Sequence, residues 1–290
     1  MTDVLAIGGG HGLAATLSAA KCYASSITAL VSLADDGGSS GELRSALGIP
    51  PPGDLRKCLL ALANENLGLA NAMEFRFENN HALGNLILVG LTSTMGGIVP
   101  ALDELARVFH ISGRILPATD GMVTLVGSSI TVGENNTVLE GLVVKGQSQI
   151  NKTEGITNVR LEQNQVTVPQ VSIDAIQDAD QILIGPGSLY TSVLAALCPT
   201  SIRQALARAK GKKIYICNLK EQVPETKGYT VRDHLVALER HEIYVDFVLI
   251  DSSNIEIGGE ISVPYENAVL SQDGRVHDSK LLARCLEEIS

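Results

Sequence analysis

The sequence predicts an α/β protein with a doubly wound, mainly parallel sheet and a small β-rich insertion. Three observations favour this fold class. Short β-branched apolar runs alternate with helix-like stretches along most of the chain. Two of these runs end in glycine-rich loops, and 290 residues with 45% hydrophobic content are enough to bury one large core. Because no internal repeat or long Pro/Ser linker divides it, we expect residues 1–290 to form a single domain.

The first part of the chain predicts two strand–loop–helix units followed by further helices. Asp54 follows a proline turn and is expected to cap the helix behind it. The run from Leu86 to Leu91 is too apolar for a surface helix, so we expect it to lie buried. The elements expected here are strands 4–7 and 27–33 and helices 13–20, 55–64, 86–91 and 100–109.

A β-rich insertion is expected over about residues 115–168. There the pattern changes to short alternating segments separated by Gly, Asn and Glu, which is typical of antiparallel strands. Alternation of helix and strand then resumes, which returns the chain to the parallel sheet. The elements expected after the insertion are helices 173–179, 191–209 and 230–240 and strands 181–184, 213–217 and 245–250.

Composition excludes several function classes. A net charge of −10, no Lys/Arg cluster and 3% aromatic residues argue against a nucleic-acid partner. No apolar run reaches the roughly 18 residues of a membrane span, and the first residues do not resemble a signal peptide, so we expect no membrane insertion. Five scattered cysteines fit reduced thiols in a cytoplasmic protein.

The first glycine-rich loop fits a phosphate-binding turn. The segment Gly10-His11-Gly12-Leu13-Ala14-Ala15 satisfies the dinucleotide fingerprint, and Asp35 follows the next strand about 20 residues later. The alternative is a tight strand-to-helix turn that needs glycine only for its backbone. We favour phosphate contact at Gly9, Gly10 and Gly12.

The second loop, Asp35 to Arg44, is more informative. Within ten residues it holds two carboxylates, a glycine-rich backbone, two hydroxyl groups and a guanidinium. Carboxylates can accept sugar or base donors or hold a metal, whereas amides, hydroxyls and Arg44 suit phosphate. An Asp-Gly turn capped by Ser40 would explain Asp36 but would leave Asp35 and Arg44 unexplained. We therefore favour a binding role.

Other candidates follow later in the chain. Asp54 and Arg56 fit a helix cap with a surface arginine as well as they fit a ligand-facing pair. His81 is more typical of a structural histidine than of a base, whereas Asn85 is a candidate donor to the ligand.

The segment Gly185 to Ser192 follows an apolar strand and begins a helix at the carboxyl edge of the sheet, where ligands bind in open α/β folds. A type II turn at Pro186 and Gly187, capped by Ser188, is the alternative, but it does not account for the density of hydroxyl groups. Asn218 ends another strand at the same edge.

Together these motifs resemble the YvcK/CofD-like family over most of the chain. The string Asp35 to Gly41 and the segment Pro52 to Arg56 are closer to the branch named for a gluconeogenesis factor than to the 2-phospho-L-lactate transferases. His11 stands where threonine is usual, and Asn218-Leu219-Lys220-Glu221 replaces the usual Asn-x-Met-Thr. The ligand-binding residues implied by position are Gly9, Gly10, Gly12, Asp35, Asp36, Ser39, Ser40, Arg44, Asp54, Arg56, Asn85, Gly187, Ser188, Thr191 and Asn218.

The resemblance implies a cytoplasmic bacterial protein with a Rossmann-like, three-layer α/β core. It further implies binding of nucleotide sugars, notably UDP-N-acetylglucosamine, and a regulatory role that links gluconeogenic growth to cell shape and cell-wall synthesis. It assigns no catalytic residue. A homo-oligomer and protein partners in cell-wall synthesis are compatible with it.

Two enzyme readings stay open. In a transferase of the 2-phospho-L-lactate type acting on a nucleotide-activated substrate, Asp35 or Asp36 would hold Mg²⁺ against the diphosphate. These two aspartates are the weak candidates for a metal, and no dedicated metal site is expected. A nicotinamide-dependent oxidoreductase is favoured only by the first loop and Asp35.

Overall fold

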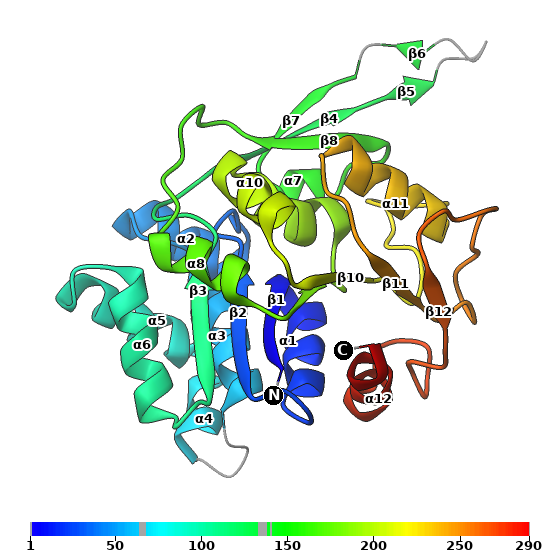
Figure 1. The fold of residues 1–290 in the computed structure, drawn as a ribbon. Helices are drawn as coiled ribbons and strands as arrows, with labels where there is room; N and C mark the ends of the chain where they lie inside the picture. Colours follow the sequence, from blue (N-terminus) through cyan, green and yellow to red (C-terminus); the bar gives the residue numbers. More distant parts are fainter. Residues whose placement is uncertain (1, 64–67, 133–137, 140, 290) are drawn as a thin grey trace.

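A seven-stranded parallel sheet forms the centre of the molecule, in the order β12-β11-β10-β9-β1-β2-β3 (Figure 1). The central strand β1 (Asp3–Gly8) pairs with β2 (Ser26–Val31) on one side and with β9 (Gln181–Ile184) on the other. The other strands are β3 (Gly113–Pro117), β10 (Lys212–Ile216), β11 (Phe247–Ile250) and β12 (Tyr265–Asn267). The computed structural model describes residues 2–63, 68–132, 138–139 and 141–289.

Helices cover both faces of this sheet, because alternate residues of each strand are buried on opposite faces. Val4 and Ala6 of β1 belong to one core, whereas Leu5 and Ile7 belong to the other. The first core packs against α1 (Gly10–Ala20), α3 (Gly53–Leu62), α5 (Leu83–Thr94), α6 (Ile98–Val108) and α12 (Ser279–Ile289). The second packs against α8 (Gln170–Asp178), η1 (Leu189–Leu194), α9 (Ala195–Leu197), α10 (Thr200–Arg208) and α11 (Val231–Arg240). The predicted doubly wound sheet is confirmed.

The β-rich insertion forms a separate antiparallel sheet of the order β7-β4-β8 at one end of the molecule (Figure 1). The insertion was expected to begin at residue 115, but it begins later in the chain, since Ile115 lies in β3 and pairs with Ala29 of the parallel sheet. The insertion contains β4 (Leu125–Ser129), β5 (Thr131–Val132), β6 (Val138–Leu139), β7 (Val143–Lys145), α7 (Gln147–Ile150) and β8 (Ile156–Leu161).

Two predicted helices differ from the structure. The helix expected over 191–209 is broken, because Pro199 has no backbone N–H to continue it and adopts an extended conformation before α10. The run from Leu86 to Leu91 is less buried than expected: in α5 only Gly84, Asn85 and Leu88 are fully buried. This helix lies in the outer layer, against α4 (Gly68–Met73) and α6, so one side of it meets solvent.

Local capping rules succeed at α11. Thr230 Oγ1 accepts the backbone N–H of Asp233 at 3.3 Å, and Asp233 Oδ2 accepts that of Thr230 at 2.8 Å, which is the predicted capping box. The rule fails at α3, where Pro52 occupies the N-cap position and Asp54 makes no capping hydrogen bond. The end of that helix expected at Asn64 lies outside the described residues. No helix in the described ranges is long and apolar enough to cross a membrane.

A buried hydroxyl joins α1 to the loop that follows β9. Thr16 Oγ1 donates to the carbonyl oxygen of Gly185 at 2.9 Å, and Thr16 is fully buried. We expect Thr16→Val to lower the free energy of unfolding by about 1–2 kcal/mol, because the carbonyl loses its donor without a change of side-chain volume. Urea denaturation measures this change. Ser18→Ala removes a hydroxyl that bonds only within α1 and should cost clearly less; equal losses would contradict this role of Thr16.

Candidate functional site

Two glycine loops touch at the centre of the carboxyl edge. The chain leaves β1 through Gly9 toward one face and leaves β9 through Gly185 toward the other, so a crevice opens between them. A Cβ atom on Gly12 would lie 2.4 Å from the carbonyl oxygen of Pro186. Gly10 has a φ of +64°, which favours glycine. Gly12 is therefore required by packing and Gly10 by its backbone conformation, and the amides at the start of α1 stay open.

Asn218 fixes the second of these loops. It lies just beyond β10, is 6% exposed, and its side-chain amide exchanges two hydrogen bonds with the backbone of Gly187. The N–H of Gly187 donates to Oδ1 at 2.9 Å, and Nδ2 donates to the Gly187 carbonyl at 2.9 Å. Asn218 thus lies where the sequence places it, and it positions the loop.

The start of η1 is occupied by a carboxylate from within the chain. The backbone N–H groups of Tyr190 and Thr191 both donate to Glu225 Oε1, at 2.9 and 2.8 Å. Burial raises the pKa of Glu225, although hydrogen bonds from these amides and from the hydroxyls of Thr191 and Ser188 oppose the rise. The amides expected to meet a phosphate here are therefore already bound, which the sequence did not predict.

The second loop divides its two aspartates between different neighbours. Asp35 Oδ1 accepts the N–H of Gly37 at 3.0 Å, while Asp36 Oδ1 accepts that of Ser148 in α7 at 2.8 Å. Burial raises the pKa of Asp35, and the charge of Asp54 acts in the same direction. Asp36 therefore holds the insertion in place, whereas Asp35 lies close to Asp54 and Ser40. Within the described ranges, no three His, Cys, Asp or Glu side chains are grouped as a metal site.

The rest of this loop links three elements. Ser40 Oγ accepts the N–H of Gly53 at 3.1 Å and so caps α3 from α2 (Gly38–Leu47). Arg44 donates to the carbonyl of Asp35 at 3.4 Å and to Thr124 Oγ1 at 3.3 Å. Its guanidinium therefore joins the loop to the insertion.

Asp54 and Arg56 have different surroundings. Asp54 pairs with Lys57 at 3.0 Å, and a Cβ on Gly9 would lie 2.8 Å from Asp54 Oδ2, so its carboxylate lies beside the first loop. Arg56 is 2% exposed and turns toward α4, where it donates to the Met73 carbonyl at 3.5 Å. Burial lowers the pKa of Arg56. Only Asp54 of this pair reaches the crevice.

A chain of polar side chains links α5 to α2. Asn85 Nδ2 donates to Ser39 Oγ at 3.0 Å, and Ser39 Oγ lies 2.9 Å from His81 Nδ1. His81 Nε2 is 3.7 Å from Glu42 Oε2. Asn85 is 3% exposed, and its Oδ1 has no hydrogen-bond partner among the described residues.

Sequence reasoning missed a basic side of the crevice. A cavity of about 200 Å³ adjoins the first loop and is lined by Gly12, Gly187, Lys220, Arg275 and His277. Burial lowers the pKa of His277 to about 4, although a hydrogen bond with the backbone of Cys217 and the negative charge of Asp251 both act to raise it. Gly12 and Gly187 were candidates from the sequence, but no motif pointed to Arg275 or His277, because they come from a segment far away in the chain. The structure thus brings cations to one side of the loops and Asp35 and Asp54 to the other.

Strand order, glycine loops and insertion together define a CofD-like α/β protein. The model of the family described as 2-phospho-L-lactate transferase CofD matches residues 4–277, and the chain belongs to this family. Within it, the chain is 41% identical over 245 residues to the gluconeogenesis factor of Halalkalibacterium halodurans (82% of this chain, 73% of that protein). It is 39% identical over 267 residues to that of Bacillus subtilis (89% and 81%). The resemblance to this branch is confirmed.

A crystal structure of a UPF0052 family member from Bacillus halodurans has the same fold. It superposes with a TM-score of 0.88 at 35% identity, covering 98% of this chain and 99% of that one.

His277 makes stability depend on pH. In the unfolded chain the pKa of His277 is the ordinary value of 6.5, whereas in the folded chain the pKa is about 4. Stability is therefore full above pH 6.5 and falls as the pH drops through this window. We expect the wild type to lose about 2 kcal/mol more than His277→Gln between neutral and mildly acidic pH, measured by urea denaturation at both. Equal losses in the two proteins would contradict the assignment.

Proposed function

We propose that the crevice between β1 and β9 binds a nucleotide sugar of the UDP-N-acetylglucosamine class. The observation that carries the proposal is the buried Oδ1 of Asn85, next to Ser39 of the second glycine loop, which has no hydrogen-bond donor among the described residues. Leaving such an atom unpaired costs about 1–3 kcal/mol. A hydroxyl or N–H group of a ligand relieves that cost, and sugars and bases carry both.

The basic side supports an anionic group on the same ligand. In the described chain, the amides of Gly10, His11 and Gly12 have no acceptor, and they lie at the positive end of an 11-residue helix. Lys220 and Arg275 line the adjoining cavity without an ion pair to a described residue. A diphosphate fits this side, and sugar hydroxyls fit the carboxylates of Asp35 and Asp54 opposite.

A regulatory role linking gluconeogenic growth to cell shape and cell-wall synthesis is part of the proposal. It is supported by the family and by the gluconeogenesis-factor name of similar proteins. A deletion strain grown on a gluconeogenic carbon source checks it: the wild-type chain should restore growth and shape, and failure to do so would refute this part.

Calorimetric titration with UDP-N-acetylglucosamine tests binding directly. We expect saturable binding by the wild type and about tenfold weaker binding by Asn85→Ala, since a buried polar contact is lost. The matched control is Asn71→Ala, an exposed asparagine of α4. UDP-glucose, GDP and NAD serve as comparators.

Each contrary result has a distinct meaning. If Asn85→Ala binds as tightly as the wild type, the orphaned oxygen is not a ligand contact. A preference for NAD would instead favour an oxidoreductase, the weakest of the readings left open by the sequence.

A transferase acting on a nucleotide-activated substrate is the second candidate. The observation that favours it is the contact of 2.9 Å between Ser39 Oγ and His81 Nδ1, which places a proton acceptor beside a hydroxyl of the second glycine loop. Asp35 and Asp54 would hold Mg²⁺ together with the phosphates of a bound donor, since Mg²⁺ accepts one or two carboxylates plus substrate oxygens. The ion would stabilise a leaving diphosphate.

Analysis of the nucleotide recovered after titration separates the two candidates. Intact ligand is expected of a binding protein. Under the transferase reading, cleavage of the donor should depend on Mg²⁺ and should fall at least about a hundredfold in Asp54→Asn, because a carboxylate ligand is lost. Recovery of intact donor with every acceptor and metal tried would refute the transferase.

A further inference from the structure

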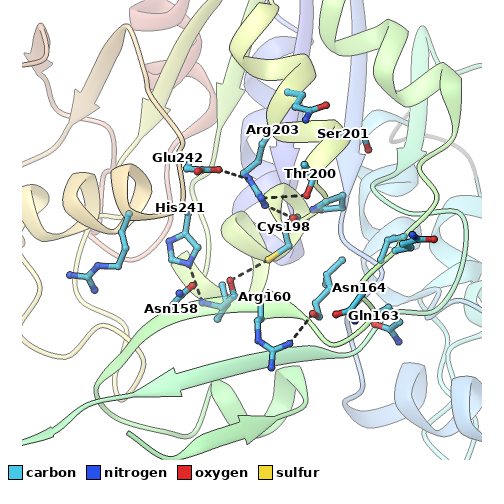
Figure 2. Close-up of a pocket in the computed structure, with 17 residues that line it drawn as sticks. Asn158, Arg160, Gln163, Asn164, Cys198, Thr200, Ser201, Arg203, His241 and Glu242 are labelled. Atoms are coloured by element: carbon cyan, nitrogen blue, oxygen red, sulfur yellow. Dashed lines mark hydrogen bonds and ion pairs between the residues drawn. The ribbon is translucent and has the colours of Figure 1, made fainter. Parts of the chain in front are cut away.

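A large cavity lies apart from the crevice and shares no lining residue with the cavity beside the first loop. It is a groove of about 720 Å³ between β8, the start of α10 and the end of α11 (Figure 2). Its volume is in the range of sites that hold small molecules. Thus the fold offers a second place for a ligand of metabolite size.

Positive charge is concentrated in this groove. Arg160, Arg203 and Arg240 line it, one from each bordering element or its end, and Glu242 is the one carboxylate among its lining residues. His241 is neutral, since it uses both ring nitrogens in hydrogen bonds and burial lowers its pKa. The groove therefore carries a local excess of cations in a chain whose net charge is −10, which favours an anionic occupant.

Arg203 is the best-placed anchor, at the centre of the groove (Figure 2). Its guanidinium donates to the carbonyl of Cys198 and contacts Thr200 Oγ1 at 3.5 Å. The buried Nε makes no hydrogen bond with a described group, although Glu242 Oε2 lies 3.4 Å away. Because the Glu242 side chain is 75% exposed, water weakens the attraction between its carboxylate and Arg203. A bound anion can therefore take the place of this carboxylate.

The start of α10 adds further donors. The N–H groups of Thr200 and Ser201 have no acceptor among the described residues, and both hydroxyls border the groove. The side-chain amides of Asn158, Gln165 and Gln204 line it without a described hydrogen-bond partner. Amides of this kind recognise hydroxyl groups, so the lining suits an anion that also carries hydroxyls.

A peptide strand does not fit here, although β8 is an edge strand. The N–H of Val159 donates to His241 Nε2 at 3.0 Å, and the thiol of Cys198 contacts its carbonyl at 3.7 Å. Arg240 donates to the carbonyl of Thr157 at 3.0 Å. Because side chains already satisfy this backbone edge, strand addition has few groups left to pair with.

We propose that the groove is a second ligand site, specific for a small phosphorylated polyol of the hexose monophosphate class. The phosphate lies against Arg203 and the start of α10, and the hydroxyls contact the surrounding amides. The proposal does not depend on the ligand of the crevice.

Calorimetric titration of the full chain with glucose 6-phosphate tests the site. We expect saturable binding that weakens about tenfold or more in Arg203→Gln and several-fold in Arg160→Gln, since charge-assisted contacts are lost. Arg208→Gln is the matched control, because Arg208 is exposed and lies on the same helix outside the groove. Glu242→Gln should bind more tightly, since it removes the competing carboxylate.

Titrations with glucose and with inorganic phosphate show how much the sugar and the phosphate group each contribute to binding. Glucose alone should not bind, and phosphate should bind more weakly than the complete sugar phosphate. No saturable binding of glucose 6-phosphate at millimolar concentration overturns the proposal, as does equal binding by Arg203→Gln, Arg160→Gln and the wild type. Equal affinity for phosphate overturns the polyol part.

Thermal unfolding of each variant establishes that it is folded. Titration of the same variants with UDP-N-acetylglucosamine distinguishes binding in the groove from binding in the crevice. Arg203→Gln should retain whatever nucleotide-sugar affinity the wild type has, and Asn85→Ala should retain affinity for glucose 6-phosphate. Loss of glucose 6-phosphate binding in Asn85→Ala would place that ligand in the crevice and overturn the second site.

Discussion

The close crossing of two loops at the centre of the sheet is the constraint on which the rest depends. From β1 the chain proceeds to β2 on one side, and from β9 it proceeds to β10 on the other side. The loops after β1 and β9 therefore diverge to opposite faces of the sheet, while their first residues stay in contact. Gly12 admits the carbonyl of Pro186 only because it has no side chain. Thr16 then ties the two loops together through a buried hydrogen bond. Every other group of the crevice is positioned relative to this crossing.

Charge is divided across the crossing. Asp35 and Asp54 lie on the side of α2 and α3, whereas the cations Lys220 and Arg275 border the opposite cavity. Burial disfavours the charged form on both sides, because it raises the pKa of Asp35 and lowers the pKa of His277. An acidic protein can hold an anion under these conditions, because open amides and local cations outweigh its long-range repulsion.

The insertion connects the crevice to the second groove. Asp36 holds α7, and Arg44 reaches Thr124, so the second glycine loop and the insertion are held together. The opposite border of the insertion, β8, forms one wall of the groove and is held by His241. η1 and α9 run between the two regions, from Ser188 beside the crevice to Cys198 in the groove. The insertion thus contacts the second glycine loop on one side and borders the groove on the other.

The alternation of strands and helices, the parallel sheet and the glycine loops could be predicted from the sequence, because these depend on runs of apolar residues and on backbone freedom over a few positions. Its failures have equally local causes: Pro199 divides a helix that hydrophobic periodicity alone continued, and Asp54 was assigned to a cap that Ser40 supplies from another helix. Which groups lie near the glycine loops became clear from the three-dimensional structure alone. Glu225 occupies the start of η1 and His277 borders the first loop from distant parts of the chain, and no periodic pattern encodes such contacts between remote segments.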